Sequence, residues 1–232
     1  MKTLSAIYHL LVLSLACGAL LVVPTLLTGA EKPRVPRVGE SRPKPEGPSP
    51  TVAAGTGLAT TQLSTALTPA DLVAYLLSED AGVTVSNITY TGANIAAGTF
   101  TGGEEIIGFA QGIVLSSGDI ANIIGPNVSD GISSSNGQAG DADLSQLVGE
   151  ETNDAAVLEF DFVPTGNKVV FQYVFGSDEY NEYVNQFNDA FAFFVNGTNY
   201  AVLPNGDPVT INNINLNKNS EYYRNNDDAD RG

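Results

Sequence analysis

The chain has 232 residues and a formal net charge of −16 at pH 7, and most of its few basic residues lie before residue 45. Such an acidic field repels phosphate backbones and anionic lipids, so we expect no nucleic-acid partner. The single His, Cys and Met all lie in the first 17 residues, and there is no Trp. If the chain is cleaved near Ala30, the remaining part has no Ser-His-Asp or Cys-His nucleophile and no His- or Cys-ligated metal. Carboxylates, hydroxyls and amides are then left for its chemistry.

Residues 1–30 have the features of a secretory signal peptide. Lys2 gives a charged start, residues 6–23 are apolar, and a break at Pro24 is followed by small residues up to Ala30. Two alternatives stay open: an uncleaved membrane anchor, because residues 4–27 are almost long enough to span, and, more weakly, a lipoprotein acylated at Cys17. The segment predicts export to the cell surface or the medium. Membrane attachment would come only through this segment or through a C-terminal anchor that the sequence lacks.

Residues 31–60 form a linker rich in Pro, Gly, Ser and charge. This composition cannot bury a core and favours an extended, polyproline-like spacer. We expect one domain after it, over residues 61–232. The residues from 212 onward are rich in Asn and Asp, so we expect either a disordered tail or a fold that is truncated at its C-terminus.

One helix is predicted, beginning after Thr68. Thr68 is a capping residue, Pro69 suits the first helical position, and Asp71 lies where a capping box needs an acid. Apolar residues then follow at helical spacing up to Leu77. We expect this helix to pack on the core.

Strands are predicted over most of the remaining chain. Alternation of apolar and polar residues marks 83–90, 155–163, 169–175 and 191–195, and 112–118 is a short apolar run bounded by Gly. Asn196-Gly197 favours a type I′ hairpin between 191–195 and 200–203. Many short strands with one helix indicate an all-β fold, an antiparallel β-sandwich or a jelly-roll-like arrangement, with the N-terminal helix packed on it.

The segments in order resemble the choice-of-anchor L family of bacterial exported proteins. The resemblance rests on GIVLSSGD at 112–119, GDADLSQL at 140–147, YVFGSDEYNEYV at 173–184 and FNDAFAFFVNG at 187–197. It covers roughly residues 70–223, and the last two motifs in succession are its most specific part. The resemblance implies that the protein is exported, as members of this family are, and the members differ in their C-terminal anchoring signals. It implies no catalytic activity and no established ligand.

Acidic residues in loops suggest a calcium site. Hard carboxylate oxygens are the ligands that calcium favours, although no EF-hand spacing is present. The stronger candidate ligand set is Asp178, Glu179, Glu182 and Asp189, and the weaker set is Asp119, Asp141 and Asp143. The alternative is that Asp178 and Glu179 bond backbone amides and hold a long turn.

Two tyrosines beside these acids are candidate ligand-binding residues. Tyr180 and Tyr183 could stack on a sugar ring, or they could pack in the fold as an aromatic corner. Packing is the interpretation that we favour.

Three functions are compatible with these residues. The first is a non-catalytic exported module for cell-surface or extracellular-matrix interaction, with a surface polysaccharide or a protein as its partner. The second is a calcium-dependent glycan-binding module. The third, and the least favoured, is a glycoside hydrolase that uses a carboxylate pair such as Asp178 and Asp189.

Overall fold

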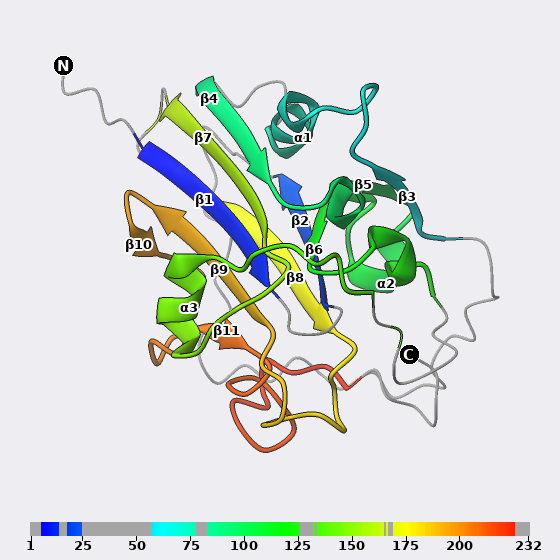
Figure 1. Ribbon diagram of the computed structural model, residues 1–232, viewed down its shortest axis with the longest axis vertical. Coiled ribbons are helices and arrows are strands. Elements are labelled where there is room, and N and C mark those ends of the chain that lie inside the picture. The colour runs from blue at the N-terminus through cyan, green and yellow to red at the C-terminus, as the bar shows by residue number, and fades with distance from the viewer. Residues whose placement is uncertain are drawn as a thin grey trace.

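The computed structural model describes residues 6–13, 18–24, 57–77, 83–125, 132, 134–164, 166 and 169–225, and for the first two ranges it describes strand pairing only. Two antiparallel sheets face each other and enclose the main core (Figure 1). The predicted all-β sandwich is therefore confirmed. Rings of the two sheets meet in the core: Phe171 and Phe193 stack with centroids 4.2 Å apart.

Sheet A has six strands. Five of them follow one another in the order β10-β9-β1-β7-β4, and β11 also pairs with β9. Its strands are β1 (Ala6–Leu13), β4 (Val83–Thr91), β7 (Ala156–Pro164), β9 (Ala190–Val195), β10 (Thr198–Asn199) and β11 (Val209–Thr210). Sheet B is five-stranded in the order β3-β5-β6-β2-β8. Its strands are β2 (Gly18–Pro24), β3 (Ala59–Gln62), β5 (Ala97–Thr101), β6 (Gln111–Ser116) and β8 (Phe171–Ser177).

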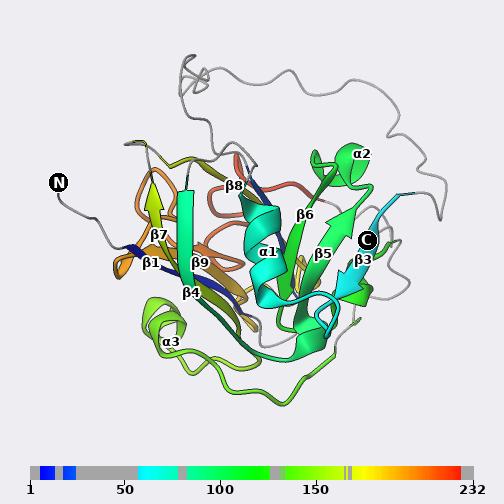
Figure 2. The same cartoon turned by 90° about the horizontal axis from the view of Figure 1, so that it is seen from above.

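Helix α1 (Pro69–Leu76) lies where β4 and β6, from opposite sheets, leave the core open (Figure 2). The structure confirms its predicted cap: the Thr68 side chain accepts from the Asp71 amide, and the Asp71 carboxylate accepts from the Thr68 amide at 2.7 Å. The Thr68 hydroxyl also donates to the Asp71 carboxylate at 2.6 Å, and this bond together with the one from the Thr68 amide lowers the pKa of Asp71. Leu72 and Val73 are buried against both sheets, so the helix closes one side of the sandwich.

Strand β7 shows the alternation that the sequence predicted. Leu158, Phe160 and Phe162 face the core, while Glu159 and Asp161 are partly exposed on the other side. The outer face of sheet A is also covered where α3 (Ala142–Val148) packs on it, because Leu144 of that helix joins Val157 and Phe194 in a second cluster. A third apolar cluster, Phe100, Val114 and Ile120, lies outside the main core on sheet B.

The hairpin after β9 is confirmed, with one correction. Asn196 and Gly197 have φ values of 51° and 77°, as a type I′ turn needs. The strand after the turn, however, is Thr198–Asn199, where 200–203 was predicted. Asn199 ends the pairing because its side-chain oxygen accepts from the amides of Phe193 and Ala201.

Several short elements were not predicted. They are α3, α2 (Glu104–Ile107), η1 (Asn94–Ala96), η2 (Ile120–Ile123), β3 and β5. The predicted signal peptide overlaps β1 and β2, and its cleavage stays a prediction. The predicted linker lies outside the described residues up to residue 56. Within the described part of the chain, no helix is long and apolar enough to cross a membrane.

Candidate functional site

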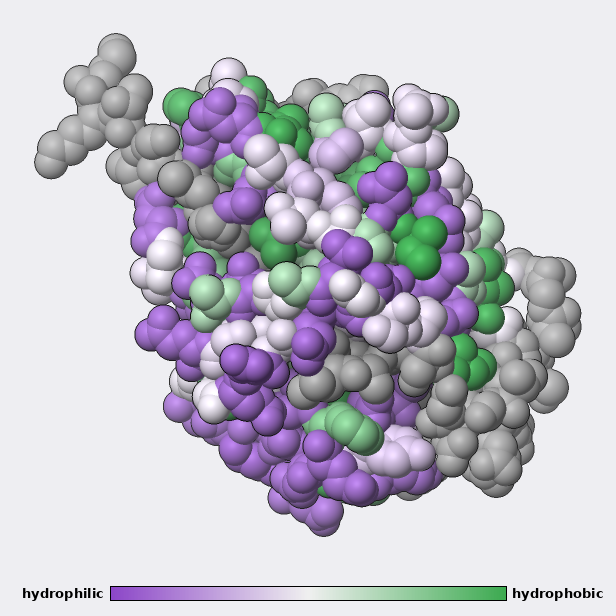
Figure 3. Space-filling model, in the orientation of Figure 1, coloured by the Kyte–Doolittle hydropathy of each residue, from purple (hydrophilic) through white to green (hydrophobic). Residues whose placement is uncertain are grey.

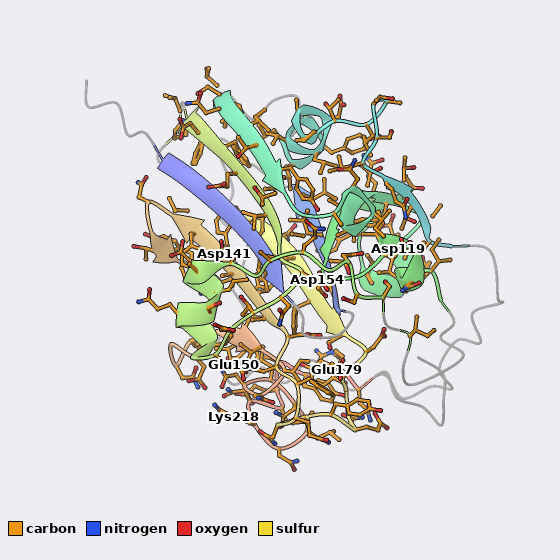
Figure 4. All side chains as sticks on the ribbon, viewed as in Figure 1. Asp119, Asp141, Glu150, Asp154, Glu179 and Lys218 are labelled. Atoms are coloured by element: carbon orange, nitrogen blue, oxygen red, sulfur yellow. The ribbon has the colours of Figure 1, made fainter. Side chains whose placement is uncertain are left out.

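The β8–β9 connection and the C-terminal segment meet at one end of the sandwich. This end, residues 178–189 and 205–225, is called the amide-rich end because asparagines recur through both segments. It lies at the bottom of Figure 4, where Glu179 and Lys218 are labelled. In the same orientation, Figure 3 shows that this end is mostly hydrophilic.

Glu179 is a buried carboxyl group of this end. Its side chain is only 3% exposed. Burial, together with the neighbouring negative charge of Asp178, raises the pKa of Glu179 to about 7. Its backbone amide donates to the Ser177 hydroxyl at 3.0 Å, which fixes the start of the connection where β8 ends. Glu179 therefore changes charge near neutral pH while it is held inside the fold.

Asp189 lies at the other end of the connection and has no exposed surface. Its Oδ2 accepts a 2.5 Å hydrogen bond from the Ser177 hydroxyl, and its backbone carbonyl accepts from the Ile211 amide at 3.1 Å. Asp189 thus ties the end of β8 to the start of β9 and to the residue after β11. A carboxylate in this position braces the loop from inside.

Tyr180 packs between the two segments of the amide-rich end. Its hydroxyl donates to the Ile214 carbonyl at 2.6 Å, and its ring lies 4.8 Å from the ring of Tyr223. Burial, with smaller effects from Tyr223 and Asp189, raises the pKa of Tyr180. The arrangement agrees with the packing interpretation of Tyr180.

Amide hydrogen bonds complete the contact between the two segments. Asn185 donates its backbone amide to Oδ1 of Asn212 at 2.6 Å, and Asn212 donates its own to Oδ1 of Asn188 at 3.1 Å. The Tyr223 hydroxyl donates to Oδ1 of Asn181 at 2.7 Å. These bonds hold the loops in one arrangement without using charged groups.

The remaining candidates of the stronger set lie at the surface of the connection. Asp178 is partly exposed and Glu182 is exposed. Tyr183 is half-buried, and its ring packs against Phe187 at 5.7 Å. Phe187 is 39% exposed, so this aromatic pair reaches the surface.

Asp119 of the weaker set has a local structural role. Its Oδ1 accepts from the Ala121 amide at 2.8 Å and from the Gln62 side chain at 2.6 Å. It therefore caps η2 and joins it to β3. Figure 4 shows Asp119 far across the molecule from Asp141, so the weaker set does not form one group.

Asp141 and Asp143 lie together at the start of α3, and this corrects their predicted place on a loop. Oδ1 of Asp141 accepts from the backbone amides of Asp143 and Leu144, at 2.8 and 3.1 Å, which makes Asp141 the cap of the helix. Both acids line a shallow pocket of about 220 Å³ beside Gln138 and Glu159. The pocket is polar and lies on the outer side of sheet A.

Asp154 is a buried acid that the sequence analysis missed. Its Oδ2 accepts from the Ser135 hydroxyl at 3.0 Å and the Asn136 amide at 3.1 Å, and its Oδ1 accepts from the Gln138 amide at 2.5 Å. Its φ of 52° is left-handed, a conformation that Asp tolerates better than most residues. Asp154 thus holds the Ser- and Asn-rich loop against β7, and only its position after Asn153 hinted at a turn.

Comparison with known proteins identifies the family of the domain. The family model described as Choice-of-anchor L domain matches residues 59–231. The chain belongs to the Choice-of-anchor L domain family. No curated protein and no solved structure matches the chain significantly.

Choice-of-anchor L domains are surface-associated bacterial modules that are generally non-catalytic. Asp189, one member of the suggested hydrolytic pair, is fully buried and so has no surface with which to contact a substrate. Among the described residues, no three His, Cys, Asp or Glu side chains come together in a group able to hold a metal ion.

Proposed function

We propose that this Choice-of-anchor L domain is a non-catalytic exported module that adheres to a cell-surface or matrix partner through its amide-rich end. The observation that carries the proposal is the pair of exposed apolar side chains presented there on hydrogen-bonded loops: Leu216 is 53% exposed and Tyr222 is 47% exposed. Loops fixed before binding lose less conformational entropy when a partner docks. The amide-rich end is thus built to hold a partner.

The chemistry of this end favours a polysaccharide as the partner. Side-chain amides both donate and accept hydrogen bonds, as hydroxyl-rich ligands require. An exposed aromatic ring supplies a flat apolar face with a polar tip. Lys218 is held by Asp207 at 3.4 Å and by the Asn213 side chain at 2.5 Å, so its charge is largely matched within the protein. Glu182 and Glu221 are exposed acids of the same end, so a neutral glycan fits this surface better than an anionic one.

A binding screen of the purified protein against surface polysaccharides, matrix proteins and whole cell envelopes tests the proposal. We expect binding, and we expect Tyr222→Ala and Leu216→Ala each to weaken it about tenfold. Tyr75→Ala is the matched control, because Tyr75 is 41% exposed on α1, away from the amide-rich end. A folded protein that binds none of these partners would contradict the proposal.

Calcium at the β8–β9 connection is a second candidate feature of the same module. The supporting observation is that burial and, to a smaller extent, the negative charge of Asp178 raise the pKa of Glu179; a bound cation would relieve the repulsion between the two acids. Backbone carbonyls and waters would have to supply the remaining oxygen ligands. Thermal melting with EDTA and with restored calcium is the test: a rise in Tm that Asp178→Asn removes supports the site, and an unchanged Tm removes it.

A further inference from the structure

Asp207 and Pro208 form the one Asp-Pro pair in the sequence, and they lie in a tight turn just before β11. Two backbone hydrogen bonds of 2.8 Å close this turn: the Gly206 amide donates to the Leu203 carbonyl, and the Leu203 amide donates to the Asp207 carbonyl. Gly206 has a φ of 89°, a conformation that Gly adopts easily. The Asp207 carbonyl belongs to the Asp207–Pro208 peptide bond, so the folded turn holds this bond in one position.

The Asp207 side chain is held through one of its two oxygens. Oδ2 accepts from the side-chain amides of Asn205 and Asn219, each at 3.1 Å, and lies 3.4 Å from Nζ of Lys218, which Figure 4 labels. Within the described part of the chain, every hydrogen bond to this carboxylate goes to Oδ2, and Oδ1 is left to react. The bond from Asn219, followed by the effects of Lys218 and Asn205, lowers the pKa of Asp207. The carboxylate therefore stays ionised in mild acid.

The Asp207–Pro208 bond places a nucleophile beside a favourable leaving group. Oδ1 can add to the carbonyl carbon of its own residue, because the five-membered ring that forms contains atoms of Asp207 only. Two groups held together in this way react as if each were present at very high concentration. The Pro208 nitrogen has a ring carbon in place of the amide hydrogen. This substitution makes it more basic than an ordinary peptide nitrogen, so acid protonates it more readily as the bond breaks.

The Leu203 amide supplies a donor for the charge that develops in this reaction. When Oδ1 adds to the carbonyl carbon, negative charge collects on the Asp207 carbonyl oxygen. The Leu203 N–H already points at that oxygen at 2.8 Å, and a donor fixed in advance stabilises such a charge better than mobile water does. In an unfolded chain this donor is not in place. Folding should therefore speed the reaction.

We propose that the domain cleaves its own Asp207–Pro208 peptide bond in mild acid. Oδ1 of Asp207 bonds to the carbonyl carbon of the same residue, and the C–N bond to Pro208 breaks. Its electron pair leaves on the Pro208 nitrogen, which takes a proton from the solvent. Water then opens the cyclic anhydride, which restores the side-chain carboxyl group and leaves a new α-carboxyl group on Asp207. Each molecule reacts once and consumes one water, so this activity goes beyond adhesion without making the domain an enzyme.

The two pieces should remain together after cleavage. β11 follows the cleaved bond and pairs with β9, with Val209 opposite Phe191. Ile211 and Ile214 are buried in the fold. The product is thus a nicked domain, in which the segment from Pro208 onward is held without a covalent link. The pieces should co-elute in native gel filtration and separate in denaturant. Separation under native conditions would overturn this part of the proposal.

Incubation of the purified chain at pH 5 tests the cleavage directly. One sample is folded, as circular dichroism verifies, and the other is kept in urea at the same pH, with protease inhibitors in both. Mass spectrometry should find two fragments, one beginning at Pro208, whose masses sum to that of the chain plus one water. We expect cleavage to be about tenfold or more faster in the folded sample. An intact folded chain, or equal rates in the two samples, would overturn the proposal.

Two variants separate the nucleophile from the leaving group. Asp207→Asn removes the carboxylate, and Pro208→Ala keeps it but supplies an ordinary peptide nitrogen. Each should slow cleavage about tenfold or more, and the Ala variant should do so while Asp207 keeps its hydrogen-bond partners. Asp143→Asn is the matched control, because it removes an exposed acid at the start of α3 and should leave the rate unchanged. Cleavage of Asp207→Asn at the wild-type rate would contradict self-cleavage, since the Asp207 carboxylate would then have no part in it.

Discussion

The hydroxyl of Tyr180 donates a 2.6 Å hydrogen bond to the backbone carbonyl of Ile214. The bond joins two segments that are 34 residues apart in the sequence and form the two halves of the amide-rich end. The Tyr180 ring also packs against Tyr223, so the contact combines a polar and an apolar part. Tyr180, which the sequence suggested as a ligand-binding residue, thus holds the surrounding loops together.

Tyr180→Phe should therefore lower the stability of the protein. The variant keeps the ring contact with Tyr223 but leaves the Ile214 carbonyl without this donor. A lost hydrogen bond of this kind costs about 1 kcal/mol, or a fall in Tm of roughly 2–4 °C at this chain length. Thermal melting measures the change, and Tyr75→Phe on α1 is the control. Equal melting of the two variants would show that the bond contributes nothing.

Glu179→Gln should change how stability depends on pH. In the folded protein the pKa of Glu179 is raised from 4.5 to about 7, so between these values the folded state binds more protons than the unfolded state. The contribution of this group to the free energy of unfolding consequently falls as pH rises from 4.5 to 7 and is constant above that window.

The Gln variant has no carboxyl group at this position, so it lacks this fall in the free energy of unfolding. Its stability relative to wild type should rise across the window, by up to about 3 kcal/mol. Chemical denaturation at pH 4.5, 6 and 7.5 measures the difference. Glu182→Gln removes a charge from the same connection at an exposed position and is the matched control. A constant difference for Glu179→Gln would refute the raised pKa.

Substitution of Asp154 should release the loop that it holds. Asp154→Ala removes three hydrogen bonds to a carboxylate and places Ala at a φ of 52°, so we expect a loss of about 2–4 kcal/mol. Asp154→Gly removes the same bonds without the backbone strain, and its loss should be smaller but still clear. A Gly variant as stable as wild type in denaturant melts would mean that the carboxylate does not brace the loop.

The parts of the fold that the sequence predicted are those with a local physical cause. The capping box at Thr68 and Asp71 specifies where α1 begins, and Asn196-Gly197 specifies the hairpin after β9. Alternation placed Leu158 and Phe160 on the core side of β7. In each case the deciding interactions lie within a few residues, so spacing alone revealed them.

The parts that were missed depend on distant contacts. An apolar leader and a buried interior strand have the same composition, so residues 6–24 gave no sign of pairing with β7 or β8. Asp154 binds residues 16 to 19 positions earlier, and Asp189 is buried by the way β8, β9 and β11 meet. The sequence around each of these two acids is polar and resembles that of a solvated loop. Helix α3 is different, because Asp141 before Leu144, Leu147 and Val148 is a capped helical pattern that the sequence did contain.

Asp141→Ala tests whether that cap starts α3. The side chain accepts from two backbone amides of the first turn, and loss of such a cap costs about 1 kcal/mol. Asp141→Asn keeps an accepting oxygen, so its stability should stay close to wild type. Asp143 is an exposed acid two residues later, and Asp143→Ala should lower the stability by only a few tenths of a kcal/mol. Because Leu144 covers Val157 and Phe194, fraying of the helix should also speed hydrogen exchange at the N-terminal half of β7. Equal losses for Asp141→Ala and Asp143→Ala would mean that general acidity near the helix start, and not the cap, sets the stability of α3.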